Sequence, residues 1–161
     1  MAHAGGVPEP RNLEQRTVDA LAILRARHAD LWLASAPGKT ASAAHLVPLS
    51  YAWTGEHVVV ATPPNAVTTR NVIDSGRARL GLGGTRDVVM IDAVLDRSVV
   101  VDDVEHELAE RYAEQADWDP RTGGPGYVYL LLRPHRMQVW REANELTGRT
   151  VMTDGRWLHP G

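Results

Sequence analysis

The residues best suited to chemistry lie at the start of a predicted short helix, residues 66–74. Thr68-Thr69-Arg70-Asn71 stands in its first turns, and Thr62 ends the strand before it. A helix N-terminus offers unpaired N–H groups and partial positive charge, so it binds phosphate readily, and threonine hydroxyls and an arginine would add donors. Alternatively, the threonines only cap the helix while Arg70 pairs with Asp74 four residues on. The residues by themselves leave both interpretations open.

Three other segments resemble known motifs but lack a required residue. Gly38-Lys39-Thr40 looks like the end of a P-loop, but Leu33 stands where that motif needs its first glycine, so we predict a hairpin loop. Gly81 to Arg86 fails as a dinucleotide fingerprint, because Arg86 replaces the last glycine. His106-Glu107-Leu108-Ala109-Glu110 lacks the second histidine of a zinc-protease helix, and the chain has no Gly-x-Ser-x-Gly elbow. No metal site is predicted.

The first third of the chain predicts a helix and then strands that must position these groups. Asn12 and Gln15 have capping-box spacing ahead of an amphipathic helix from about Leu13 to Ala29, with His28 at the edge of the core. The following short apolar runs, joined by glycine turns, predict strands at Asp30 to Ala36, Ala43 to Trp53 and Glu56 to Thr62. Pro48 inside the second run implies an edge strand, a bulge or an interrupted ladder.

The rest of the chain adds strands and two helices. Asn65 is the predicted N-cap of the helix from Ala66 to Asp74, and Asp102-Asp103 the predicted cap of a helix through about Gln115. Further strands are predicted at Ala78 to Gly83, Val88 to Val101 and Tyr127 to Trp140, with a terminal turn at Asp154-Gly155. Strands and helices do not alternate, which argues against a doubly wound sheet. Six strands favour an antiparallel barrel or sandwich with helices outside.

Composition excludes several classes of protein. The chain has 161 residues, a net charge of −3 and no cysteine, which removes disulfides and thiolate chemistry and favours the cytoplasm. Mild acidity argues against nucleic acid or anionic membrane as a partner. The Gly/Pro-rich residues 1–10 do not read as a signal peptide and are predicted to form a flexible arm before one domain, residues 11–161. No apolar run is long enough for a membrane helix.

Four short motifs occur in a telling order. They are Thr68-Thr69-Arg70-Asn71-Val72, Arg77-Ala78-Arg79-Leu80-Gly81, Thr85-Arg86-Asp87-Val88-Val89, and Arg133 to Trp140 in the last predicted strand. Together with the N-terminal helix and the first hairpin, this arrangement resembles the pyridoxamine 5′-phosphate oxidase-like split β-barrel proteins, which bind FMN or the deazaflavin F420. The resemblance spans about residues 13–142.

The resemblance implies a mainly β (α+β) fold, a six-stranded antiparallel split β-barrel with flanking helices. It also implies a homodimeric flavoprotein oxidoreductase that transfers hydride through FMN or F420, with the cofactor cleft at the dimer interface and a small-molecule substrate. By position, the cofactor-binding residues would be Val47, Pro48, Leu49 and Ser50 along the ring, Thr62, Thr68, Thr69 and Arg70 at the phosphate, and Trp140, which could equally be a core tryptophan. Asn71 would be structural, and Ser50 or Tyr51 could assist proton transfer.

The chain departs from this pattern at Ala66 and Thr68, where many relatives carry basic residues. Losing one or two charge-assisted hydrogen bonds, each about 1.5–3 kcal/mol, would weaken cofactor binding by tenfold or more. The alternative function is therefore a non-catalytic carrier or sensor built on the same barrel. A haem-binding relative, with His45 or His57 as axial ligand, is a further alternative.

Overall fold

The structure, a computed structural model, describes residues 6–38, 44–124 and 126–160. The helices are α1 (Leu13–Leu24), α2 (Val67–Ser75) and α3 (His106–Ala116), with 3₁₀ turns at Val101–Asp103 and Ala143–Glu145. The strands are β1 (Asp30–Ser35), β2 (His45–Ser50), β3 (Ala52–Trp53), β4 (Val58–Thr62), β5 (Arg77–Gly84), β6 (Asp87–Val100), β7 (Val128–Trp140), β8 (Thr150–Thr153) and β9 (Arg156–Trp157). None of the helices in these ranges is long and apolar enough to span a membrane.

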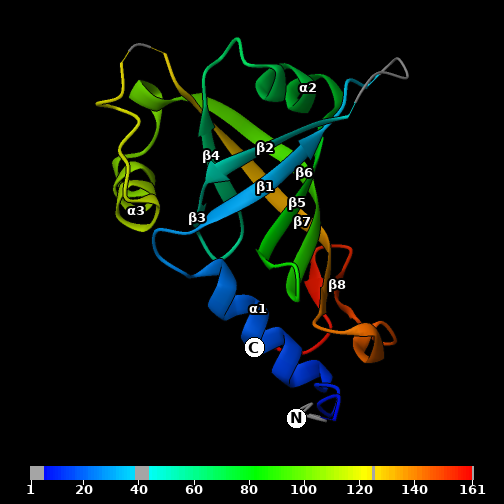
Figure 1. Cartoon of the computed structure of the whole chain (residues 1–161). Helices are drawn as coiled ribbons and strands as arrows, with labels where there is room; N and C mark the ends of the chain where they lie inside the picture. Colours follow the sequence, from blue (N-terminus) through cyan, green and yellow to red (C-terminus); the bar gives the residue numbers. More distant parts are fainter. Residues whose placement is uncertain (1–5, 39–43, 125, 161) are drawn as a thin grey trace, which may run out of the picture.

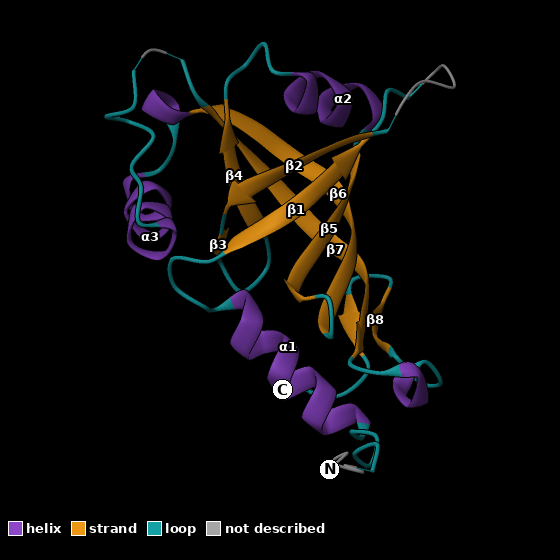
Figure 2. Cartoon of the chain, in the orientation of Figure 1, coloured by secondary structure: helices purple, strands orange, loops and turns teal. Residues whose placement is uncertain are grey.

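All described strand pairings are antiparallel, and they join into one sheet. The strand order is β2-β1-β5-β6-β7-β4-β3, and β8 and β9 extend it from β7. The end strands β2 and β3 do not pair with each other, so the sheet is not closed. Figures 1 and 2 show β1 and β2 running across the direction of β6 and β7, with α2 over one end of the strands and α1 beyond the other. This confirms the predicted mainly β class, with nine described strands rather than six.

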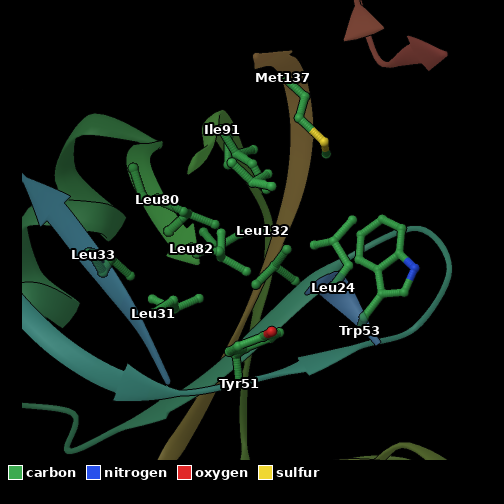
Figure 3. Packing of buried hydrophobic residues seen from close by; sticks show 14 of the residues in the cluster. Leu24, Leu31, Leu33, Tyr51, Trp53, Leu80, Leu82, Ile91, Leu132 and Met137 are labelled. Carbon is green, nitrogen blue, oxygen red and sulfur yellow. The ribbon is translucent and has the colours of Figure 1, made fainter. Parts of the chain in front are cut away.

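Two apolar clusters hold the elements together. The larger one lies on the inner face of the curled sheet and contains fully buried leucines from several strands, among them Leu31, Leu80 and Leu132 (Figure 3). The smaller one packs Tyr112 of α3 against Tyr129 of β7 on the other face. Their rings meet edge to face with centroids 5.1 Å apart.

The N-terminal helix begins as predicted but ends earlier. Asn12 and Gln15 form the predicted capping box. The helix stops at Leu24 instead of Ala29, because the side chain of Gln115 donates hydrogen bonds to the carbonyls of Leu24 and Ala26 and so closes its C-terminus. His28 therefore lies in an exposed bend with φ of 56°, and its expected place at the edge of the core is wrong.

Two of the predicted caps are also wrong. The N-cap of α2 is Ala66 rather than Asn65. Asp102-Asp103 forms a 3₁₀ turn instead of capping a helix, because the N–H of buried Val101 donates to the carbonyl of Tyr127 and holds the chain there. The helix α3 then starts at His106 after Glu105.

The predicted strand from Ala43 to Trp53 is divided in two. It breaks at Tyr51, whose hydroxyl donates to the carbonyl of Ile23 in α1, and the chain passes from β2 to β3 there. Pro48 lies in β2, at one end of the strand order, which confirms the edge position that a proline requires. Asp154-Gly155 forms the predicted turn, between β8 and β9.

Candidate functional site

The N-terminus of α2 has no side-chain cap. Ala66 is in extended conformation at the N-cap position and cannot accept from the first turn. The first N–H groups of a helix have no partner inside it, so those of Val67 and Thr68 remain available to an anion. The helix ends at Gly76, whose φ of 69° places it in the left-handed region. The local sequence thus closes the C-terminus of α2 and leaves the N-terminus open.

The hydroxyls of Thr62 and Thr69 are engaged with each other. Their Oγ1 atoms are 2.7 Å apart, and the Thr69 hydroxyl donates to the carbonyl of Pro63 at 2.7 Å. A hydroxyl has one hydrogen, so Thr62 must be the donor to Thr69. In this arrangement neither threonine has a hydrogen left for a phosphate, and the pair instead ties α2 to the end of β4.

Arg70 lies exposed beside the open end of α2. One Nη donates to the carbonyl of Asn65, which leaves its other N–H groups free for an anion. Asp74 does not pair with it: its carboxylate accepts from the N–H of Gly38 at 2.7 Å. The structure therefore combines the two interpretations of this segment, with threonines that serve the fold and an arginine that faces solvent.

Asn71 and Thr68 point into the protein. The Asn71 side chain donates to the hydroxyl of Ser35 in β1 at 3.3 Å, and both residues are buried. This is the structural role expected for Asn71. Thr68 is 2% exposed, so its side chain serves packing more than an incoming ligand.

The predicted ring-lining strand presents its residues to two different sides. Val47 and Leu49 pack against the core cluster, so only their backbone atoms are open to a ligand. Pro48 pairs with the exposed Trp32 and shares its outer face. The Ser50 hydroxyl, on the same side as Pro48, donates to the Asp30 carboxylate at 2.9 Å.

Tyr51 is not available for proton transfer. Its hydroxyl is bonded to the carbonyl of Ile23, and burial raises the pKa of Tyr51 to about 12. Ser50 is therefore the better placed of the two hydroxyls that the sequence singled out.

Trp140 lies at the far end of the same outer sheet face. It pairs with Val88 of β6 and lines an apolar hollow of about 580 Å³ together with Trp32 and Leu46. The Arg149 guanidinium lies 5.2 Å from its ring centroid. The structure thus places Pro48, Ser50 and Trp140 on one face of the sheet, while Thr62, Thr68, Thr69 and Arg70 gather around α2.

Comparison with known proteins identifies the fold. No protein-family model and no curated protein matches the sequence. Among solved structures, an F420 reductase is 14% identical with a TM-score of 0.59, over 81% of this chain and 98% of that one. A Listeria innocua protein assigned as a pyridoxamine 5′-phosphate oxidase is 16% identical with a TM-score of 0.57, over 80% and 98%. The chain has the pyridoxamine 5′-phosphate oxidase-like split-barrel fold.

The same fold occurs in a heme binding protein from Mycobacterium smegmatis, which is 20% identical with a TM-score of 0.58, over 92% of this chain and 60% of that one. In the present split barrel, the Nε2 atom of His57 lies 2.8 Å from the carboxylate of Asp96 and is not free for a metal. His45 lies partly buried in β2. No group of three potential metal ligands occurs among the residues that the structure describes.

The motifs rejected from the sequence have ordinary places in the split barrel. Gly81 to Arg86 forms the end of β5 and its turn into β6, where Gly83 has a φ of 77°. His106 and Glu110 lie on the exposed side of α3, 3.9 Å apart. The predicted loop at Gly38-Lys39-Thr40 lies mostly outside the described residues.

Three arginines near the site were not among the predicted site residues. Arg77 and Arg79 alternate along β5, and Arg136 lies across the sheet in β7, all exposed on the outer face. Arg79 and Arg136 share one carboxylate, that of Asp92, at 3.3 and 3.8 Å. The alternation Arg77-x-Arg79-x-Gly81 was visible in the sequence, but only the sheet register brings Arg136 to the same place.

The residues at α2 fit the phosphate end of a flavin-type cofactor. Unpaired first-turn N–H groups and one exposed guanidinium form an anion-binding donor set. This set is smaller than a site with a lysine would offer, since Thr68 and Ala66 supply no charge and Thr62 and Thr69 donate internally.

Proposed function

We propose that this chain is an oxidoreductase that uses FMN or F420 to transfer a hydride to or from a small molecule. The observation that carries the proposal is the open N-terminus of α2, with exposed Arg70 beside it, on a barrel whose fold is shared with an F420 reductase. A capped helix end or an Arg70–Asp74 ion pair would have argued against it.

The proposed cofactor contacts follow from where each group lies. The first-turn N–H groups of α2 and the guanidinium of Arg70 hold the phosphate. The backbone of Val47 to Leu49 and the outer side chains of Pro48 and Ser50 follow the ring. Thr62 and Thr69 hold α2 against β4, and Thr68 packs beneath the helix, so all three act by positioning the phosphate contacts.

When bound, the cofactor supplies the ring that carries the hydride, and the protein supplies binding, orientation and exclusion of water. The Ser50 hydroxyl is the proton-bearing group on the outer face of β2, and its bond to Asp30 fixes its direction. The predicted second subunit completes the cleft. We place Trp140 and its apolar surroundings in that cleft and the protein in the cytoplasm.

The test is a titration of the purified protein with FMN and with F420, followed by absorbance and fluorescence. We expect saturable binding of one of them with a micromolar or lower Kd, and reoxidation of the bound reduced form by an acceptor. A protein that binds neither at micromolar concentration is not such an enzyme.

The second candidate function is a non-catalytic carrier or sensor of the same cofactor. It is favoured by the small donor set at α2, where Thr62 and Thr69 donate internally and Thr68 is buried. Tight binding without turnover across a panel of acceptors would support it over the oxidoreductase. A Soret band on adding haem would instead support the haem-binding alternative, with His45 as the remaining ligand candidate.

A further inference from the structure

The outer face of the split barrel has an ordered arrangement of side chains. Trp32, Gly81 and Met90 lie in one row across β1, β5 and β6, because each pairs with the next in the sheet register. The neighbouring row ends in Trp140, which pairs with Val88. These residues line the hollow of about 580 Å³, a size typical of small-molecule sites.

The walls of this hollow are unusually exposed for apolar side chains. Trp32 is 53% exposed and Leu46 beside it 58% exposed. Large apolar side chains that gather at one exposed site mark a binding surface. Strands β5 and β6 separate Trp32 from Trp140, so three strand spacings, roughly 14 Å, lie between their backbones. That span accommodates a system of two or three fused rings.

The floor of the hollow is a glycine that the fold does not require. A methyl group at Gly81 would lie 3.8 Å from Met90 Cε and 4.0 Å from Trp32 Cβ, which are ordinary contacts, and its backbone is not in the left-handed region. By contrast, a methyl at Gly83 would meet the carbonyl oxygen of Asp87 at 2.2 Å, so that glycine serves the turn. Glycine within a strand marks close approach of another group.

One end of the hollow is positively charged. Arg79 lines it and also lines a second hollow that continues toward Arg77 and the end of α2. Arg77, Arg79 and Arg136 gather around a single carboxylate, that of Asp92, on this part of the described face. The excess of two positive charges favours an anionic group there.

We propose that this face binds a planar apolar molecule with an anionic substituent, an aromatic carboxylate in the simplest case. The rings lie over Gly81 between Trp32 and Trp140, and the anion meets Arg77 and Arg79. As a substrate site it rests on the proposed function, because the hydride partner would be such a molecule. As a binding site it stands without the cofactor.

Charge distinguishes this occupant from a second copy of the chain. A two-fold interface brings the same surface together from both subunits, so arginines need acids on that same face. Among the described residues that line the two hollows, Asp92 is the one acid, and it is already shared by Arg79 and Arg136.

The experiment compares 2-naphthoate with its neutral analogue 2-naphthylmethanol, by calorimetry and by quenching of tryptophan fluorescence. We expect the protein to bind 2-naphthoate at least tenfold more tightly. Gly81→Val should weaken both ligands at least tenfold by filling the floor. Arg77→Gln with Arg79→Gln should reduce the affinity for 2-naphthoate to that for the alcohol and leave the alcohol unchanged.

Matched controls are Gly6→Val, at a glycine with open space around it, and Arg25→Gln with Arg156→Gln, at two exposed arginines. Neither should change binding, and thermal unfolding should confirm that all variants fold. The proposal is wrong if 2-naphthoate does not bind at millimolar concentration, or binds Gly81→Val as well as the parent.

Parallel measurements separate this proposal from the proposed function. If FMN and F420 do not bind but 2-naphthoate does, the oxidoreductase proposal fails and this site stands. If Gly81→Val abolishes cofactor binding and the cofactor displaces 2-naphthoate, the face belongs to the cofactor ring and this proposal fails. It also fails if sedimentation shows a dimer that Gly81→Val dissociates and that does not bind 2-naphthoate, since a second copy then covers the face.

Discussion

Arg70 is the residue on which the proposed phosphate site depends most. It is exposed and bonded only through one Nη to the carbonyl of Asn65 among the contacts that the structure describes, while the nearby threonines donate to each other and to Pro63. Because Thr68 supplies no charge, the guanidinium carries the charged part of the interaction.

Arg70→Ala should therefore weaken the binding of FMN or F420 by about tenfold or more, the effect of one charge-assisted hydrogen bond. Fluorescence titration measures it, with Arg156→Ala, at an exposed arginine in β9, as the matched control. Equal affinity of the Arg70→Ala protein and its parent would remove Arg70 from the site.

Glu145 is the buried carboxylate that fastens the two ends of the domain. It is 3% exposed and accepts from the backbone and the guanidinium of Arg11, at 2.8 and 2.7 Å, and from the N–H of Arg141 at 2.8 Å. Hydrogen bonding to Arg11 is the main reason that the pKa of Glu145 falls to about 2.

Glu145→Gln should cost about 3–5 kcal/mol of unfolding free energy at neutral pH, since it leaves Arg11 buried without its charge partner. A depressed carboxyl pKa stabilises the fold above its ordinary value of 4.5 and stops doing so as the pH falls toward 2. The difference between the two proteins should thus shrink over that interval in urea unfolding series. Glu142→Gln, which breaks the exposed pair with Arg86, should cost less than about 1 kcal/mol at any of these pH values.

At the scale of elements, the open end of α2 is held in place by the hydroxyl chain from Thr62 through Thr69 to Pro63. This chain links the last residue of β4 to the first turns of α2. The helix is short and uncapped, so its orientation depends on such tertiary contacts.

Thr69→Val keeps the volume but leaves the Thr62 hydroxyl and the Pro63 carbonyl unpaired, and should cost about 1–3 kcal/mol. The double variant with Thr62→Val should cost less than the sum of the single variants, because both hydroxyls are then gone. Chemical denaturation measures this cycle. Thr122→Val, at an exposed threonine, serves as the control with little expected effect.

The junction between α1, α3 and the sheet depends on one side chain. Gln115 of α3 donates to the carbonyls of Leu24 and Ala26 and accepts from the N–H of Trp53 at 2.9 Å. Gln115→Ala should cost about 2–3 kcal/mol, as three hydrogen bonds to backbone groups are lost together. Gln15→Ala, which removes one arm of the capping box, should cost about 1 kcal/mol or less in the same thermal or chemical unfolding series. Equal costs would mean that Gln115 does not organise the junction.

At the scale of the whole molecule, the two apolar clusters lie on opposite faces of one continuous sheet. Val58 and Val60 of β4 belong to one cluster, and the intervening Val59 to the other. Alternation along a single strand thus couples both cores.

We therefore expect residues 11–161 to unfold in a single calorimetric transition, as predicted for one domain. A bound cofactor at a hundred times its Kd should add about 2.7 kcal/mol, or roughly 5–10 °C in Tm. Two separate transitions, or a Tm unchanged by both FMN and F420, would contradict the domain assignment and the cofactor assignment respectively.

Local physics explains why much of this fold could be predicted from the sequence. Alternating apolar runs and glycine turns located all six long strands, and Asn12 with Gln15 marked the start of α1, because these signals depend on neighbours a few residues away. Pro48 indicated an edge for a similar reason, since proline cannot donate to a second strand.

Tertiary contacts decided what local signals could not. Gln115, from the far end of α3, sets where α1 ends, and the Thr62–Thr69 bond engages hydroxyls that the sequence offered to a ligand. The outer face, with Trp32, Trp140 and three arginines around Asp92, is assembled by strand register. Register joins residues up to about a hundred positions apart, and sequence spacing carries no record of it.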